Sequence, residues 1–215
     1  MFKFRLNIVK DINPFNNNTI NFSFFILLLV SSVSSYGQGN IPPPTGTDSN
    51  TAEHNAILTI PEVALLDLEA ASGTTVVLNP SVPTEAGMAL SFPVVDSNIW
   101  LNYSSIVGSV SEPLRNIDVQ ISSGTVPAGT ALMVMATSDS GNGDGLMGVP
   151  SSTIVLSNLN QNIITNIGSA YTGDGITKGH NLQYTLDLLS STGSYGLLDF
   201  DFNETLVLTY TLSDN

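Results

Sequence analysis

The segment Leu182-Gln183-Tyr184-Thr185-Leu186-Asp187-Leu188 is the clearest strand signal in the chain, because apolar and polar side chains alternate along it. Successive side chains of a β-strand point to opposite faces, so a period of two predicts a strand with one buried face. The runs 117–122 and 205–212 alternate in the same way. These three runs predict a domain of antiparallel strands.

Further short apolar runs, each bounded by turn residues, are candidate strands: 55–60, 63–69, 74–78, 90–95, 98–104, 131–137 and 153–157. Short strands at this spacing predict an all-β antiparallel sandwich or barrel, and we favour an immunoglobulin-like β-sandwich of about 8–10 strands. Pro93 predicts an edge or bulged strand at 90–95, because proline cannot donate to a ladder.

The segment 156–167 fits two structures. Its apolar residues recur at helical spacing, and Gly168 is suited to the end of a helix. Ile163 and Ile164 are β-branched, which favours a strand. Both a short helix and a strand remain open here.

Residues 1–37 have the three parts of a secretory signal peptide. A start containing Lys3, Arg5 and Lys10 precedes the apolar core 22–30, and small residues precede a cleavage position after Gly37. The apolar core is shorter than the roughly 20 residues of a membrane-spanning helix. We therefore expect cleavage and export, to the cell surface or the extracellular space, with the periplasm as an alternative.

Residues 38–53 are rich in Pro, Thr, Gly and Asn and contain the run Pro42-Pro43-Pro44. Such a segment cannot bury enough apolar surface to fold, so it predicts a disordered linker. The sandwich domain would then be 54–215, which is large enough to form a core without disulfides.

Positive charge almost disappears after the leader. Residues 38–215 carry 17 acidic side chains against Arg115 and Lys178, a formal charge of −15. Binding to a phosphate backbone needs clusters of Lys and Arg, so this balance excludes nucleic acid and anionic membrane surfaces as partners. The acidic surface is suited to solubility through self-repulsion, and cation binding is the alternative.

The reactive side chains needed for catalysis are scarce. The sequence has no cysteine, and its two histidines, His54 and His180, are too few for a three-histidine zinc site. It has no G-x-S-x-G, H-E-x-x-H or phosphate-binding glycine motif. We predict that the protein is not an enzyme; His180, beside a strong strand, is the better candidate for a role, with a hydrogen-bonded structural histidine as the alternative.

The loop 139–145 is the best candidate metal site. Asp139, Asn142 and Asp144 offer oxygen ligands on a glycine-rich backbone, as hard cations such as Ca²⁺ require. The spacing does not match an EF-hand, since Ser151 stands where a bidentate Glu is needed. Asp174 would add a ligand only if the fold brings its loop to this one, and a solvated turn is the alternative.

Trp100 is the best candidate for glycan contact. It is out of phase with Ile99 and Leu101, so it faces outward if those two face the core. An exposed Trp100 beside Asn102 would stack on a sugar, whereas a covered Trp100 would belong to an ordinary core. Tyr171 and Tyr195, in glycine-rich loops, are secondary candidates.

The two ends of the domain suggest self-association. The last strand, 205–212, carries strand-forming residues on both faces, and a mobile N-terminal extension precedes the domain. Such elements allow strand exchange, in which a segment of one chain completes the sheet of another. An ordinary final strand of the sandwich is the alternative.

Several features together resemble bacterial fimbrial, pilin-like and related exported surface β-sandwich proteins. These features are the export signal, the Thr-, Ser- and Gly-rich strands, the segment 181–186 and the alternating C-terminal run 205–212. This resemblance implies a structural or adhesive subunit that acts through protein contacts, with His54 to Ile60 a better donor strand than the Pro-rich 41–44. A carbohydrate-binding module or a calcium-stabilised adhesin is the alternative.

Overall fold

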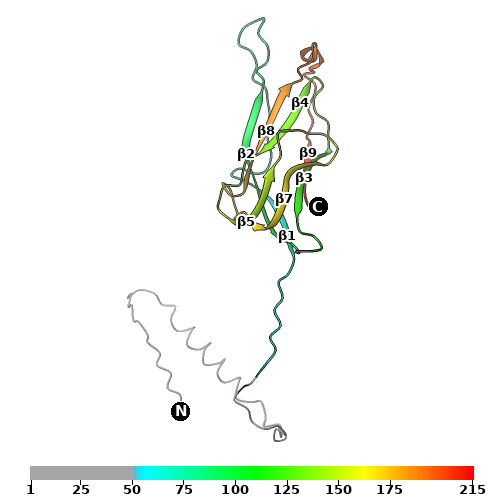
Figure 1. The fold of residues 1–215 in the computed structure, drawn as a ribbon. Coiled ribbons are helices and arrows are strands. Elements are labelled where there is room, and N and C mark those ends of the chain that lie inside the picture. Colours follow the sequence, from blue (N-terminus) through cyan, green and yellow to red (C-terminus); the bar gives the residue numbers. More distant parts are fainter. Residues whose placement is uncertain (1–50, 52) are drawn as a thin grey trace, which may run out of the picture. The chain divides into compact units, whose positions relative to one another are not determined.

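The computed structural model describes residue 51 and residues 53–215, of which 57–215 form one compact unit (Figure 1). The predicted signal peptide 1–37 and almost all of the linker 38–53 lie outside the described residues. Within the described part of the chain, no helix has the length and apolar character needed to cross a membrane.

Nine strands form the fold, and a single 3-10 turn, η1 (Ser194–Leu197), is the one helical element among the described residues. The strands are β1 (Val63–Ala70), β2 (Val94–Ile106), β3 (Arg115–Ser123), β4 (Thr130–Ala136), β5 (Asp144–Pro150), β6 (Ile154–Val155), β7 (Gln161–Tyr171), β8 (His180–Leu188) and β9 (Val207–Asp214). All of their ladders are antiparallel. The prediction of an all-β antiparallel fold is therefore confirmed.

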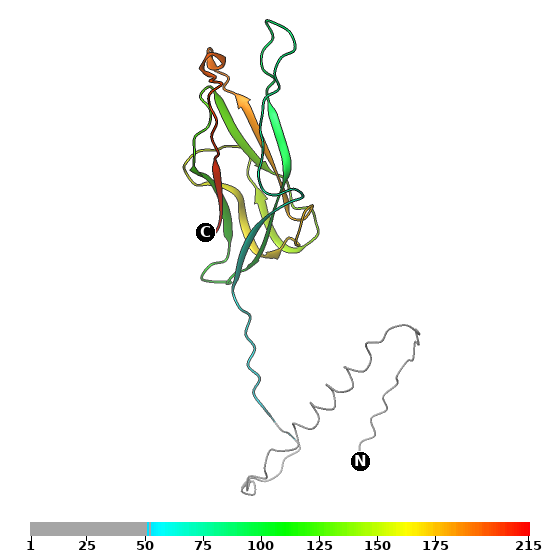
Figure 2. The ribbon, with the colours of Figure 1, turned by 180° about the vertical axis from the view of Figure 1, so that it is seen from behind.

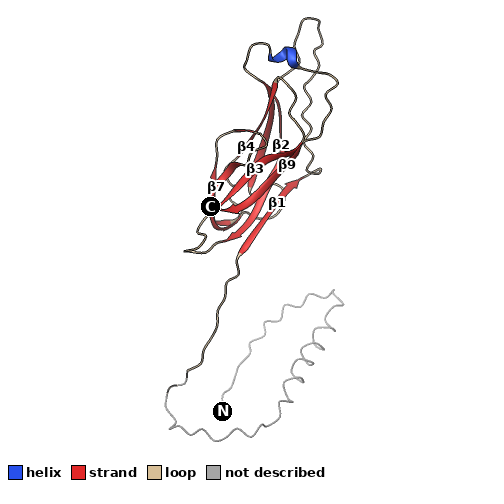
Figure 3. Ribbon diagram, turned by 90° about the vertical axis from the view of Figure 1, so that its right-hand side faces the viewer, coloured by secondary structure: helices blue, strands red, loops and turns tan. Residues whose placement is uncertain are grey.

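The strands form two layers, β1-β2-β8-β4-β6 and β9-β3-β7-β5. Hydrogen bonding continues from one layer to the other where β2 meets β7, at the pairs Ser104–Tyr171 and Ser105–Ala170. Figures 2 and 3 show the sheet folded over on itself, with β1 and β9 in different layers. This arrangement is a β-sandwich whose layers are continuous at one corner.

The core lies between the two layers and follows the predicted alternation. Leu182, Tyr184 and Leu186 of β8 are buried, and Ile117 and Val119 of β3 are fully enclosed opposite them. Burying one such aliphatic side chain stabilises the folded state by about 1.5–3 kcal/mol. Both layers therefore contribute to one continuous core.

The segment 156–167 contains no helix, and its second half belongs to β7. Ile163 and Ile164 are both buried although they are adjacent, because the ladder with β3 changes register here. Asn166 has a φ of 60°, which locally breaks the alternation of a strand. This bulge spaces the buried residues as a helix would, which explains the ambiguity in the sequence.

Other differences concern strand boundaries. The predicted strands 90–95 and 98–104 are one strand, β2, with an irregularity between Asp96 and Ile99, and Pro93 stands just before it. The predicted 74–78 strand forms no ladder, although Val76 and Leu78 pack against the core. Sequence patterning also missed β5, which contains glycines and little alternation.

Candidate functional site

The fold brings the loop 139–145 to the loop 172–179. The backbone N–H of Ser140 donates to the carbonyl of Gly179 at 2.9 Å, and Lys178 Nζ donates to Asn142 Oδ1 at 2.6 Å. Among the described residues, however, Asp174, Asp139 and Asp144 do not lie close enough together to form a three-ligand metal site. The two loops are thus joined by hydrogen bonds of their own.

The three expected calcium ligands have different surroundings. Asn142 Oδ1 accepts from the Lys178 ammonium, and Asp144 Oδ1 accepts from the N–H of Gly145. Asp139 Oδ2 accepts from the N–H of Gly141, while its Oδ1 is buried with no partner among the described groups. One carboxylate oxygen is therefore free for a cation, and calcium binding at this loop stays a prediction.

His180 lies in a buried polar network at this end of the sandwich. Its ring is fully buried and stacks on Tyr103, with ring centroids 5.6 Å apart. Nδ1 lies 2.8 Å from the carbonyl oxygen of Thr137 and donates to it, and Nε2 lies 3.0 Å from the hydroxyl oxygen of Tyr103. The Tyr103 hydroxyl also contacts the carbonyl of Met147. Both ring nitrogens of His180 therefore lie within hydrogen-bond distance of protein groups, as in a structural histidine.

Burial lowers the pKa of His180, although the Thr137 carbonyl and Asp139 oppose this effect. Below about pH 6.5 the unfolded chain takes up a proton at this histidine while the folded chain stays neutral. The stability linked to His180 is therefore complete above about pH 6.5 and is lost as the pH falls toward the lower folded pKa, at up to about 1.4 kcal/mol per pH unit.

As the pH decreases from about 7 to about 5.5, we expect the free energy of unfolding to fall more steeply for the wild-type protein than for His180→Gln. Urea unfolding at several pH values measures this difference in slope. His54 is present in both proteins, so the comparison isolates His180. Parallel pH profiles would show that this histidine does not titrate differently on folding.

The two residues expected to contact a glycan differ in their exposure to solvent. Trp100 is half-buried, and Ile99 and Leu101 face the core as expected. Asn102 is only 4% exposed, because the loop 172–179 covers it and Gly175 O accepts its side-chain N–H at 2.9 Å. Asn102 thus has no free surface beside Trp100, and glycan contact by this pair stays a prediction.

A separate shallow groove crosses the outer face where the two layers join. Tyr171, 54% exposed, lines it together with aliphatic side chains of β1 and the end of β2, chiefly Val63, Leu65 and Ile106. Asp144 and Ser169 add polar groups. The groove thus combines an exposed aromatic ring with an aliphatic wall, and the sequence analysis had marked two of its residues, Tyr171 for glycan contact and Asp144 for metal binding.

Arg115 is the feature that sequence analysis missed. It is 1% exposed, and its guanidinium pairs with Glu62, just before β1, and with Asp214 at the end of β9, where Nε lies 2.8 Å from Oδ1. The carbonyl of Val63 also accepts from it. The hydrogen bond to Asp214 is the largest cause of the raised pKa of Arg115. We call these three side chains the Arg115 clamp.

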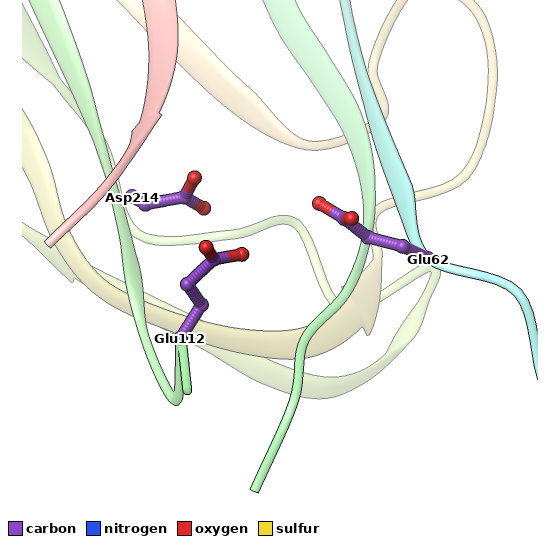
Figure 4. A group of neighbouring side chains, drawn as sticks. All are labelled: Glu62, Glu112 and Asp214. Carbon is purple, nitrogen blue, oxygen red and sulfur yellow. The ribbon is translucent and has the colours of Figure 1, made fainter. Parts of the chain in front are cut away.

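Glu112 lies beside the clamp, and its carboxylate comes within 4.8 Å of the carboxylates of Glu62 and Asp214 (Figure 4). All three acidic side chains are exposed, and they form the one such group of possible metal ligands among the described residues. The Arg115 guanidinium already supplies positive charge to two of them. The clamp therefore ties the residue just before β1 to the end of β9.

The segment immediately before β1 is apolar and has no neighbour. Ile57, Leu58 and Ile60 are 93%, 93% and 83% exposed, and every residue from 53 to 62 is exposed. Figure 1 shows residues 57–62, in cyan, leaving the sheets as an extended chain. The predicted strand 55–60 is therefore not formed within the described chain, because a strand needs a neighbour to accept and donate its hydrogen bonds.

The strands at the edges differ in how well they are protected against pairing. β6 has two residues, β5 contains Gly145, Gly148 and Pro150, and the β1 edge carries acidic side chains. Short length, proline and charge all discourage a further strand. β9 has eight residues, no proline and a single charge at its end, Asp214. It is the least protected edge of the described sheets.

β9 is also incompletely covered. Within the described chain it pairs only with β3. Its inward side chains, Leu208, Tyr210 and Leu212, pack against the core but stay partly exposed, as does Leu206 just before the strand. The Tyr210 hydroxyl lies 2.8 Å from that of Tyr184 in the other layer, which fixes the position of β9. β9 is thus fixed in position, while its outer edge and its core-facing side chains stay partly exposed.

No protein-family model, curated protein or solved structure matches this chain.

Proposed function

We propose that this chain is an exported structural or adhesive surface protein, a subunit of a fibre or matrix, that acts through contacts between copies. The observation that supports the proposal is the exposed apolar segment 57–60. Three exposed aliphatic residues among four consecutive positions do not help the solubility of an acidic protein that is otherwise rich in polar side chains. Their burial requires another surface.

The acceptor in this proposal is the β9 edge of a second copy. Residues 57–60 and their flanks are extended, contain no charged side chain between Glu53 and Glu62, and follow a strand-forming pattern. β9 offers an unprotected row of backbone groups beside partly exposed leucines. Adding a strand there satisfies backbone groups of both copies and covers apolar surface on each.

Sedimentation velocity of residues 38–215 tests this proposal, with an increase in mass expected as the concentration rises. In an added strand Leu58 and Ile60 share one face and Thr59 the other. Burying one leucine contributes about 1.5–3 kcal/mol, so we expect Leu58→Asp to weaken association roughly tenfold to hundredfold. Thr59→Asp is the matched control, because it adds the same charge on the opposite face.

The acceptor is mapped by crosslinking, which is simple in a chain without cysteine. A Thr59→Cys protein is mixed with a Thr211→Cys protein, whose new thiol lies on an exposed position of β9. A bismaleimide reagent is expected to join these two proteins and not to join Thr59→Cys to Val155→Cys, on the exposed edge strand β6. Equal yields with both partners would exclude β9 as the preferred edge.

Glycan binding is the second candidate function, and the groove beside Tyr171 is the observation that favours it. Aromatic rings and a few polar groups are the usual components of such sites. A wild-type chain that stays monomeric at every concentration, and that binds an immobilised polysaccharide unless Tyr171 is replaced by Ala, would support this second function against the first.

A further inference from the structure

We infer that the groove beside Tyr171 selects glycans that carry free amino groups, with a sugar ring on Tyr171 and its ammonium group at Asp144. This inference rests on the second proposed function, glycan binding, and adds the charge class of the sugar to it. It is carried by the register of four strands, which places an aromatic and an acidic side chain next to each other on one outward face.

A row of four side chains crosses the groove, one from each of β1, β2, β7 and β5. The pairs that form this row are Leu65–Ser104, Ser104–Tyr171 and Tyr171–Asp144. Directly opposed residues of antiparallel strands lie on one face, with their Cβ atoms about 4.5–5.5 Å apart. The row therefore runs in a fixed order across the groove, from aliphatic to hydroxyl to aromatic to acidic.

The dimensions of the groove suit a short glycan. Its volume is about 510 Å³, within the range of about 300–1,000 Å³ that is usual for small-ligand sites. Neighbouring strands are about 4.8 Å apart, roughly the width of a pyranose ring, so successive sugar rings can lie over successive strands. Tyr171 is 54% exposed, and the short side chain of Ser104 beside it leaves room for a ring to stack.

Asp144 gives the groove its charge. Among the described residues that line the groove it is the one with an ionisable side chain other than Tyr171. Its Oδ1 accepts from the N–H of Gly145, and its Oδ2 makes no hydrogen bond within the described chain. Lys178 donates to Asn142 and forms no ion pair with Asp144. One carboxylate oxygen therefore remains for an ammonium group of the ligand.

Arg115 does not reverse this charge. Its guanidinium lies beneath the groove, with Nη1 3.5 Å from Ser105 Oγ, but it pairs with Glu62 and Asp214. The charge that faces the groove is therefore negative. A sugar with carboxylate, sulfate or phosphate groups is repelled, whereas an ammonium group is attracted.

The test compares two tetrasaccharides that differ in the charge of their amino groups, β-1,4-linked glucosamine and its fully N-acetylated counterpart. Both are titrated into the purified protein by calorimetry at about pH 6, where carboxylates are ionised and the sugar amines are largely protonated. We expect the glucosamine tetramer to bind about fivefold more tightly, as one exposed ion pair allows. Tyr171→Ala should weaken binding of both roughly tenfold, since ring stacking does not require the charge.

Asp144→Asn removes the charge from the groove and keeps an oxygen to accept from Gly145. We expect it to abolish the preference for the glucosamine tetramer and to leave binding of the N-acetylated tetramer unchanged. Asp174→Asn is the matched control, because it removes the same charge from an exposed residue that does not line the groove. Equal losses of preference in the two variants would overturn the inference, since attraction to the net charge alone would explain them.

The same titrations separate this inference from the function on which it rests. If both tetrasaccharides bind wild-type protein equally and Tyr171→Ala removes the binding, the groove binds glycans and the charge class is wrong. If neither tetrasaccharide binds, glycan binding is itself refuted at this groove. A preference that disappears at high salt in the wild type would support the ion pair at Asp144.

Discussion

Arg115→Met is expected to lower the free energy of unfolding by about 3 kcal/mol, because the change leaves five backbone or side-chain acceptors without their donor. Methionine keeps the apolar stem in the core, so the loss isolates the guanidinium. Full removal of one partner from a buried ion pair costs about 3–5 kcal/mol. We expect the lower end of this range, since the Glu62 and Asp214 side chains are 65% and 48% exposed and regain water.

Lys178→Met is the control for Arg115→Met, because it removes the same charge from the same chain. Lys178 Nζ donates to an exposed amide oxygen of Asn142, and surface contacts of this kind contribute at most about 1 kcal/mol. Urea unfolding of the two variants and the wild type measures both effects. Equal losses for the two variants would show that net charge, and not the clamp, determines the stability.

Gly143→Ala is expected to destabilise the fold by about 3 kcal/mol or more, through a clash between two backbones. A Cβ atom at position 143 would lie 1.6 Å from the carbonyl oxygen of Tyr171 and 2.8 Å from the Cα of Thr172. Neither neighbour is the end of a flexible side chain, so the loops 139–145 and 172–179 would have to move apart. Thermal unfolding followed by circular dichroism measures the loss.

Gly196→Ala is the matched control for this substitution. Its Cβ would have no heavy atom within 4 Å, apart from neighbours along the chain. We expect a change within about 0.5 kcal/mol, as for other surface substitutions. If Gly143→Ala causes an equally small loss of stability, the packing of the two loops does not depend on this glycine, and its role is limited to the flexibility of the turn.

Residues 57–62 combine an exposed apolar run with an ion pair to the Arg115 clamp. In the proposed assembly, residues 57–60 supply the apolar surface that a second copy buries, and Glu62 is held by Arg115. The assembled protein should therefore respond to small changes in this short segment more than to changes in the exposed loops. The high acidic charge opposes contact between copies, so screening by salt should strengthen association.

The strands of the core were predictable because their signal is local. In 117–122 and 182–188 the period of two is visible in consecutive residues, and the buried face follows from it directly. The outward phase of Trp100 follows for the same reason. The register change near Asn166 was not predictable, because a bulge depends on the neighbouring strand and leaves only an ambiguous spacing in the sequence.

Composition and short-range periodicity are local properties, and they were enough to predict an all-β antiparallel domain, its alternating core strands and its shortage of positive charge. Tertiary structure alone decided that Arg115 is enclosed by Glu62 and Asp214, that Gly143 contacts Tyr171, and that residues 57–60 have no partner in their own sheet. Each of these depends on residues that are distant in the chain and meet only when the two layers pack. Pairing across such distances carries no periodic signal, and it becomes visible only in the folded protein.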